Sequence, residues 1–238
     1  MPPVLPYSAY AGRIWRLVEA QHVVSTMKLV DSAAEQEVLE AILETAKPPV
    51  PPDCAHLHYL LSTPFRYGLY PAASRFRRAG ETPGVFYAAE DPMTAVAETV
   101  WNRRRFFAAA PGTPLPDRPG TYTAFAVDVA VPLAADLTAP PLSAQAADWT
   151  DPEDYGAGLD LADRVRAEGC GLIRYASVRH PEALPNIAVL TCRAFAGTEP
   201  AEMQTWHLIL RPGRSQVRRE FPRASAEFVF GGARLAFA

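Results

Sequence analysis

Hydrophobic residues recur at helical spacing in two stretches of the chain, and each stretch carries its own start signal. Residues 32–46 (SAAEQEVLEAILETA) place apolar side chains on one helical face, and Ser32 and Glu35 have the spacing of a capping box. Residues 93–106 repeat the helical period after an Asp-Pro pair at 91–92, which is typical of an N-cap followed by proline in the first turn. Both stretches are predicted to be helices with one apolar face.

Other stretches alternate apolar and polar residues or form brief apolar runs, which predicts strands. A further short helix is expected over residues 159–168, before Gly169. The predicted strands cover residues 85–89, 122–131, 171–177, 187–195 and 206–210. The sequence therefore predicts an α+β fold with several short strands, few helices and no internal repeat.

The composition is that of a soluble globular protein. Of 238 residues, 49% are hydrophobic, and 23 Lys and Arg against 26 Asp and Glu give a formal net charge of −3. A slightly acidic chain lacks the basic charge of a general nucleic-acid binder. No apolar run approaches the roughly 18 residues that span a bilayer, and residues 1–10 lack the pattern of a secretory leader. We therefore expect neither a membrane span nor a signal peptide.

Cysteine usage adds a prediction about the compartment. The three cysteines, Cys54, Cys170 and Cys192, are scattered along the chain and odd in number. We expect them to form neither a disulfide framework nor a zinc site. The cytoplasm is then the default compartment.

Proline is in marked excess, with 24 residues in the chain, about twice the usual share of ~5%. Because proline removes a backbone donor and fixes φ, long regular elements are not expected where it clusters. The clusters lie at residues 48–52, 111–119 and 132–141. The first cluster ends the helix at 32–46 and predicts a boundary between an N-terminal helical extension, residues 1–52, and a main domain, residues 53–238.

Four arginines gather within 13 residues of this acidic chain and surround two tyrosines. A guanidinium group matches phosphate through two hydrogen bonds, and a tyrosine ring offers a flat face to a base. The combination suits a nucleotide, although a solvated surface is the simpler interpretation of the cluster taken alone. The residues are Arg66, Arg75, Arg77, Arg78, Tyr67 and Tyr70.

Glu98, Ser177 and a histidine pair are further candidates. Glu98 lies beside the apolar face of its predicted helix, so it is a solvated carboxylate unless that flank faces a pocket. Ser177 lies near the end of a predicted strand, where binding groups gather, although a lone serine there is usually structural. His56 and His58 would share one face of a strand, but no third ligand follows at a recognisable spacing, which favours a structural or hydrogen-bonding role over metal binding.

Common nucleotide-binding and nucleophile motifs do not occur in the chain. It contains no G-x-S-x-G turn, no P-loop and no G-x-G-x-x-G. Rossmann and Walker types of nucleotide binding are therefore unsupported, and no metal site is expected.

Five short motifs in a fixed order resemble the RES domain, a family named for its arginine, glutamate and serine. The motifs are TPFRY at 63–67, SRFRR at 74–78, GVFYA at 84–88, TAVAE at 94–98 and YASVR at 175–179. Each motif is short, but their order and the eleven-residue step from Tyr87 to Glu98 make the set specific. The resemblance covers roughly residues 55–195.

This resemblance implies a compact core similar to that of ADP-ribosyltransferase toxins and an enzyme that consumes NAD⁺ as its substrate. Glu98, Arg66 and Ser177 are implied to be catalytic. Arg77 rivals Arg75 as the second family arginine, because residues 74–77 read Ser-Arg-Phe-Arg rather than the commoner Gly-Arg-Phe-Asn. The implied NAD⁺ contacts are Arg66, Tyr67, Arg75, Arg77, Tyr87, Ser177 and Asn186, and His56 is kept as a further candidate.

The chemistry of NAD⁺ gives these residues physical roles. Arginines would neutralise the pyrophosphate, and tyrosine faces would hold the nicotinamide or the ribose. Glu98 would stabilise the positive charge that builds on the ribose as the N-glycosidic bond breaks, and Ser177 would hold the nicotinamide amide. No metal is needed, because nicotinamide is already a good leaving group.

Two reactions of NAD⁺ are compatible with the resemblance. Transfer of ADP-ribose to a protein side chain is slightly favoured, because the N-terminal extension and the proline loops offer surfaces for a protein target. Cleavage by water or phosphate, which would deplete NAD⁺, is the alternative. RES proteins are toxins of toxin–antitoxin pairs, so we expect a cognate Xre-type antitoxin that covers the NAD⁺ cleft and itself carries the DNA-binding segment.

Two other classes of function stay open. A non-enzymatic module would use the arginine–tyrosine cluster to bind a protein or a nucleotide. A ribonuclease toxin is disfavoured by the acidic balance of the chain and by the lack of a paired catalytic histidine.

Overall fold

The computed structural model describes residues 5–20, 29–67, 70–80, 83–110 and 112–238, and it mixes helices and strands as the α+β prediction requires. The strands are β1 (Tyr7–Glu19), β2 (Phe86–Ala89), β3 (Gly120–Asp136), β4 (Leu172–Ala176), β5 (Pro185–Val189), β6 (Glu202–Arg211), β7 (Arg214–Arg219), β8 (Ala224–Gly231) and β9 (Arg234–Phe237). The helices are α1 (Ala33–Thr45), α2 (Tyr59–Arg66), α3 (Pro92–Ala108), α4 (Ala146–Trp149) and α5 (Gly156–Ala167), with short 3-10 turns η2 (Pro52–Cys54), η3 (Leu142–Gln145) and η4 (Cys192–Ala194).

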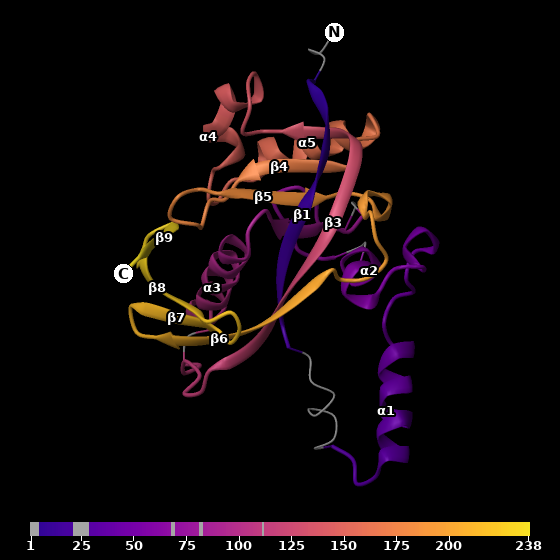
Figure 1. The fold of residues 1–238 in the computed structure, drawn as a ribbon, viewed down its shortest axis with the longest axis vertical. Coiled ribbons are helices and arrows are strands. Elements are labelled where there is room, and N and C mark those ends of the chain that lie inside the picture. The colour runs from indigo at the N-terminus through magenta and orange to yellow at the C-terminus, as the bar shows by residue number, and fades with distance from the viewer. Residues whose placement is uncertain (1–4, 21–28, 68–69, 81–82, 111) are drawn as a thin grey trace.

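One sheet organises the described residues, in the strand order β1-β2-β5-β4-β3-β6-β7-β8-β9. Strand β1 also pairs with β3 along nearly its whole length, from Tyr7 opposite Ala135 to Glu19 opposite Tyr122. Strands β1, β2, β5, β4 and β3 therefore close a ring. Figure 1 shows the two long strands β1 and β3 running side by side through the molecule, with β6 to β9 extending from the lower part of β3.

The ring has an inner and an outer face because side chains alternate along each strand. Ring strands β1 to β5 all send side chains into one buried inner cluster, which α2 covers. The outer face packs against α5 near β4 and β5 and against α3 near β1 and β3. Neighbouring residues of β3 show the alternation, since Phe125 belongs to the inner cluster while Ala124 and Ala126 face α3.

Capping residues start the two main predicted helices where the sequence indicates. The Ser32 hydroxyl accepts from the Glu35 N–H at 3.2 Å, and Asp91 accepts from the Thr94 N–H at 3.0 Å. The five predicted strands correspond to β2 to β6. The stretch predicted as a strand over 187–195 changes direction early, because β5 ends at Val189 and the chain then forms η4.

The N-terminal segment differs most from its expected form. Residues 1–52 were expected to be helical, but within them β1 lies in the main sheet. The division of the chain at residue 52 stays a prediction. Helix α1 does project from the body, as Figure 1 shows, and it buries none of its residues.

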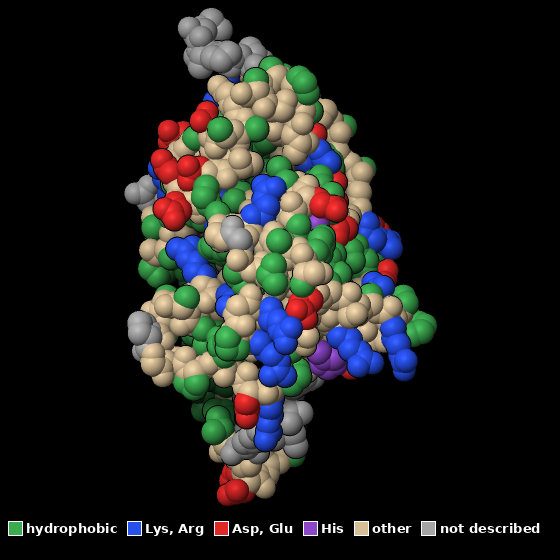
Figure 2. Space-filling view, turned by 90° about the vertical axis from the view of Figure 1, so that its left-hand side faces the viewer, with side chains coloured by type: hydrophobic (Ala, Val, Ile, Leu, Met, Phe, Trp, Pro, Cys, Tyr) green, Lys and Arg blue, Asp and Glu red, His purple; other side chains and the backbone are tan. Residues whose placement is uncertain are grey.

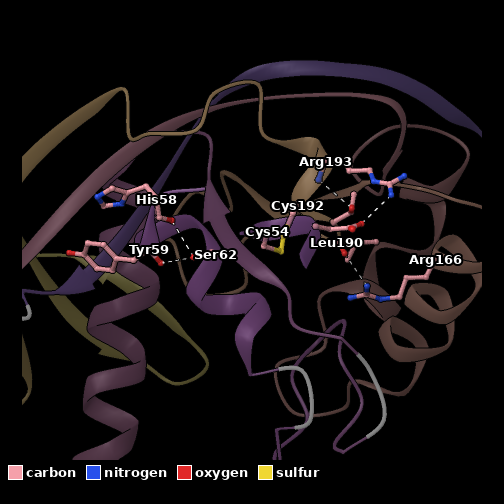
Figure 3. Close-up of a disulfide and its surroundings, with 10 residues drawn as sticks. Cys54, His58, Tyr59, Ser62, Arg166, Leu190, Cys192 and Arg193 are labelled. Atoms are coloured by element: carbon pink, nitrogen blue, oxygen red, sulfur yellow. Dashed lines mark hydrogen bonds and ion pairs between the residues drawn. A yellow bond between two sulfur atoms is a disulfide. The ribbon is translucent and has the colours of Figure 1, made fainter. Parts of the chain in front are cut away.

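The prediction for the cysteines is wrong for two of the three. Cys54 and Cys192 form a disulfide that joins η2 to η4 across 138 residues (Figure 3), whereas Cys170 is a buried free thiol. The two bonded cysteines lie far apart in the sequence, and only the packing of α2 against the ring brings them together. The cysteine content therefore gives no argument for a reducing compartment.

Charged side chains are mixed on the surface. Figure 2 shows basic and acidic groups interspersed over one face, without one large field of a single sign. Among the helices of the described ranges, none has the length and apolar character needed to cross a membrane.

Candidate functional site

A cavity of about 340 Å³ opens on the outer face of the ring. Residues of α3, of the ring strands and of the segment before α5 line it. Aromatic side chains dominate its apolar surface, namely Trp15, Tyr87, Trp101, Tyr155 and Tyr175. Its charged and amide-bearing side chains are Arg16, Arg75, Glu98, Asn102, Arg179 and Asn186.

Strand register places two of the predicted site residues, Tyr87 and Asn186, on the ring-strand part of this lining beside Tyr175. Tyr175 of β4 lies opposite Asn186 of β5, and Asn186 lies opposite Ala89 of β2. Tyr87 is two residues before Ala89, so it shares the same face. Residues about 90 positions apart in the sequence therefore meet in one cavity.

Glu98 lines the cavity from α3, so its flank of the helix faces a pocket and not only bulk solvent. Its Oε1 accepts two hydrogen bonds, from Ser177 Oγ at 2.6 Å and from Asn186 Nδ2 at 2.7 Å. No hydrogen bond within the described residues reaches its Oε2. Hydrogen bonds from the described residues thus fix one carboxylate oxygen and not the other.

Ser177 supports the carboxylate from behind. The residue is completely buried, and it does not line the cavity. Its Oγ donates to Glu98 and accepts from the backbone N–H groups of Arg179 at 3.2 Å and His180 at 2.9 Å. Because these bonds use the hydroxyl fully, Ser177 is placed to orient Glu98 rather than to touch a ligand.

Tyr87 fixes the loop that carries Arg75. Its hydroxyl lies 2.8 Å from Ser74 Oγ and accepts from the Phe76 N–H at 3.1 Å. Burial raises the pKa of Tyr87, so the hydroxyl stays protonated at neutral pH. The ring of Tyr87 is therefore a rigid part of the cavity wall.

Arg75 lines the cavity and Arg77 does not. The Arg75 guanidinium donates to the carbonyls of Trp149 at 2.8 Å and Asp151 at 2.7 Å, and it lies 4.8 Å from the ring centre of Tyr155. The Arg77 guanidinium instead lies over Tyr70 and donates to the Ala72 carbonyl at 3.1 Å.

Three other predicted site residues lie outside the cavity lining. Arg66 ends α2, where it forms an ion pair with Glu44 of α1 at 2.6 Å and donates to the Pro48 carbonyl. Tyr67 follows it at the helix end and is 36% exposed. His56 lies exposed in a turn before α2.

His58 has the hydrogen-bonding role that its sequence context favours. It caps α2, because its Nδ1 accepts from the Leu60 N–H at 3.2 Å. Across the described ranges, no group of three or more His, Cys, Asp or Glu side chains is arranged to hold a metal ion.

Two cavity arginines were missed by the sequence analysis. Arg179 lies 3.4 Å from the ring centre of Trp101 and donates to the carbonyls of Ala233 at 2.7 Å and Pro152 at 2.9 Å. It is the last residue of the YASVR motif, which was a usable signal.

Arg16 comes from β1, which the sequence analysis did not predict. Its Nη1 donates to the Tyr87 carbonyl at 2.8 Å. Arg16 lies between Ile14 and Val18 on the face of β1 that packs into the inner cluster, and the sequence carries no local signal for this strand.

The comparison with protein-family models agrees with the motifs. The family model described as "RES domain" matches residues 50–211. The fold is similar to a chain of the "Crystal structure of the M.tuberculosis MbcT-MbcA toxin-antitoxin complex", with a TM-score of 0.48 and 10% identity over 83% of this chain and 85% of that chain. No curated protein matches the chain.

Proposed function

Since the chain belongs to the RES domain family, we propose that it is an enzyme that uses NAD⁺ as its substrate and cleaves the bond between nicotinamide and ribose. The observation that carries the proposal is the Glu98 carboxylate, held through Oε1 by Ser177 and Asn186 inside an aromatic cavity. A fixed negative charge in such a site stabilises positive charge that develops on a sugar.

The polar groups of the cavity suit the nicotinamide half of NAD⁺. Asn186 Oδ1 is buried and has no hydrogen-bond partner within the described residues. An unsatisfied buried acceptor costs free energy, and the carboxamide N–H of nicotinamide would satisfy it. The ring of Tyr87 offers an aromatic surface to the pyridinium, whose positive charge favours such a surface.

The reaction needs no covalent contribution from the protein. The bond between ribose C1′ and the nicotinamide nitrogen breaks, and both electrons leave with neutral nicotinamide. The oxocarbenium-like ribose is stabilised by Glu98 Oε2 while Ser177 and Asn186 hold Oε1 in place. An acceptor oxygen or nitrogen then attacks C1′ and loses its proton to solvent or to Glu98.

A protein side chain is the acceptor that we propose, which makes the enzyme a mono-ADP-ribosyltransferase. The projecting α1 supports this choice, because it exposes Val38, Ile42 and Leu43 where a protein target would meet them. Attack by water or phosphate would use the same cavity and would instead deplete NAD⁺.

We place this activity in a toxin–antitoxin pair, as the RES family implies. The toxin would act in the cytoplasm, where NAD⁺ is abundant, and its activity would arrest growth. A cognate Xre-type antitoxin would cover the cavity and so block access of NAD⁺.

The decisive experiment follows the two products of the reaction. Purified protein is incubated with NAD⁺ labelled in its adenylate half, with and without cell lysate, and nicotinamide release is measured in parallel. We expect Glu98→Gln to lower nicotinamide release by about 10²-fold or more, because it removes the stabilising charge. The matched control is Glu37→Gln on the exposed surface of α1, which should behave as wild type.

Each result of this experiment decides between the candidate functions. A labelled protein band supports transfer, whereas nicotinamide release without a band supports cleavage by water, or by phosphate if release requires phosphate. Growth arrest that persists in a folded Glu98→Gln variant, with no nicotinamide release by wild type, would favour the non-enzymatic binding module. Relief of arrest by a co-expressed antitoxin would support the toxin–antitoxin role.

A further inference from the structure

A second hollow lies beside the candidate cavity, along the C-terminal half of α3. It has a volume of about 540 Å³, and Trp101 lines both hollows. Glu98, Trp101 and Arg105 follow one another at helical spacing, so the two hollows share one face of α3. We call the second hollow the α3 groove, and its larger lining side chains are Trp101, Arg104, Arg105, Phe107, Leu115 and Phe230.

The two arginines of the α3 groove have no acidic partner within the described residues. Arg103, on the same helix, forms an ion pair with Glu19, whereas Arg104 donates to two backbone carbonyls of β6 and β7 at 2.6 and 3.2 Å. The helix dipole favours a cation in the last turn, which accounts for Arg105 but not for the second charge beside it. The groove therefore carries two positive charges that the described side chains do not neutralise.

Aromatic rings hold both guanidinium groups in place. Arg104 lies 3.9 Å from the ring centre of Phe230, and Arg105 lies 5.4 Å from that of Trp101. A ring face covered by an arginine is closed to a nucleic-acid base, and single strands bind largely by such stacking. Carboxylates need no free ring face, and each pairs with a guanidinium through two hydrogen bonds. The groove thus suits an acidic protein segment better than a nucleic acid.

The apolar part of the α3 groove indicates more than a simple anion site. Phe107 and Leu115 pack against the cluster behind α3 but stay only partly buried. A ligand with an apolar side chain would remove this surface from water, which stabilises a complex. A free inorganic anion would use the charges alone, whereas an acidic segment with an apolar residue would use both parts of the groove.

We propose that the α3 groove binds an acidic segment of the protein that accepts ADP-ribose. The inference rests on the proposed transfer reaction and adds the class of acceptor to it. The groove only positions the acceptor. The acceptor nucleophile bonds to ribose C1′, nicotinamide leaves with the electron pair, and the acceptor proton passes to solvent or to Glu98.

The spacing along α3 also predicts where the acceptor is modified. Arg105 lies seven residues after Glu98, a rise of about 10 Å along a helix. An extended chain covers that distance in about three residues. The modified side chain should therefore lie about three positions from the carboxylates that contact the two arginines.

Fluorescence anisotropy with three labelled probes tests the groove. One probe is a synthetic peptide with a glutamate pair beside a leucine, the second has lysines in place of the glutamates, and the third is single-stranded oligothymidylate. Binding is measured for wild type, Arg105→Gln and Arg105→Glu, since Arg105 is exposed and tolerates substitution. The matched control is Arg223→Glu, an equal change of charge at an exposed site before β8, whereas Phe230 of the groove lies near the end of that strand.

We expect Arg105→Gln to weaken binding of the acidic peptide by about 1.5- to 5-fold, the range of one exposed charge. Arg105→Glu should weaken it at least about tenfold, because the reversed charge repels the peptide. Both losses should shrink at high salt. Arg105→Glu should also reduce labelling of the acceptor in lysate. Its nicotinamide release without lysate should match wild type, because Arg105 does not line the cavity.

Several results would overturn the acidic-segment site. These are equal binding of the two peptides by wild type, a loss in Arg105→Glu no larger than in Arg223→Glu, or tighter binding of oligothymidylate than of the acidic peptide, which would assign the groove to nucleic acid. If Arg105→Glu fails to fold, Arg105→Gln carries the test, and it must lose more affinity for the acidic peptide than for the lysine peptide.

The inference and the proposed function fail separately. Wild type that binds the acidic peptide through Arg105, yet releases no nicotinamide from NAD⁺, would refute the NAD⁺ chemistry and keep the acidic-segment site. Wild type that releases nicotinamide, with acceptor labelling unchanged in Arg105→Glu or absent altogether, would keep the cleavage of NAD⁺ and refute the docking of an acceptor in the α3 groove.

Discussion

At the scale of single residues, Ser177 links the stability of the protein to its proposed chemistry. Its hydroxyl accepts from two buried backbone N–H groups and donates to Glu98. We expect Ser177→Ala to lower the free energy of unfolding by about 1–3 kcal/mol, because the N–H groups of Arg179 and His180 lose their acceptor. It should also lower the rate of nicotinamide release, because Glu98 loses one of its two anchors.

Ser215 provides the matched control. Its hydroxyl is equally buried but has no hydrogen-bond partner within the described residues. Ser215→Ala should therefore leave the urea midpoint unchanged or raise it slightly, since it removes an unsatisfied polar group. Equal midpoints for the two variants would contradict the role given to Ser177.

Single residues also show which parts of the candidate site the motifs predict and which they do not. The motifs identify Arg75, Tyr87 and Glu98, and the family resemblance adds Asn186; the fold brings all four into one cavity. The motifs give no sign that Ser177 lies behind Glu98, because that depends on how α3 packs against the end of β4. Nor do they predict that Arg66 pairs with Glu44, which comes from an element outside the motifs.

At the scale of elements, α1 contacts a residue that the family resemblance places in the NAD⁺ site. Glu44 in its last turn pairs with Arg66, and the Glu44 side chain is 56% exposed. If Arg66 contacts NAD⁺, this carboxylate competes with the substrate phosphates for the guanidinium. We expect Glu44→Gln to lower the KM for NAD⁺ by about 1.5- to 5-fold, the range of an exposed ion pair.

The control for this prediction is Glu37→Gln, an exposed glutamate earlier in α1. Steady-state nicotinamide release at low and high salt provides the measurement, and the difference between the variants should shrink as salt screens the pair. An unchanged KM in Glu44→Gln would mean that Arg66 serves to attach α1 to the body instead.

The elements that sequence alone predicts are those with local signals. Caps at Ser32 and Asp91 fix the starts of α1 and α3. Strand β1 has no such signal, because neighbouring residues Ile14 and Trp15 are both buried on opposite faces and hide the alternation. Its place is set by pairing with β3, more than 100 residues away.

At the scale of the whole molecule, segments near both ends of the described chain support the cavity, one by lining it and the other by holding Arg179. Strand β1 supplies Trp15 and Arg16, and the segment before β9 supplies the carbonyl of Ala233 that holds Arg179. Both lie outside the residues that match the family model. The motifs therefore describe the centre of the site, while the complete wall depends on long-range pairing of the sheet.

The disulfide acts at this same scale, because it closes a loop across most of the domain. Cys54 and Cys192 are separated by 138 residues, and the chain-entropy relation gives such a cross-link about 5 kcal/mol of stability. The bond also fixes the segment before α2 against η4, within the inner cluster of the ring (Figure 3).

We expect dithiothreitol, or the double variant Cys54→Ala/Cys192→Ala, to lower the urea midpoint substantially. The control variant Cys170→Ala removes only the free thiol. Dithiothreitol should still lower its urea midpoint, as in wild type. A thiol titration of unfolded, unreduced protein should find one free thiol, Cys170. Three free thiols, or a midpoint that does not respond to reduction, would show that the protein is stable without this bond.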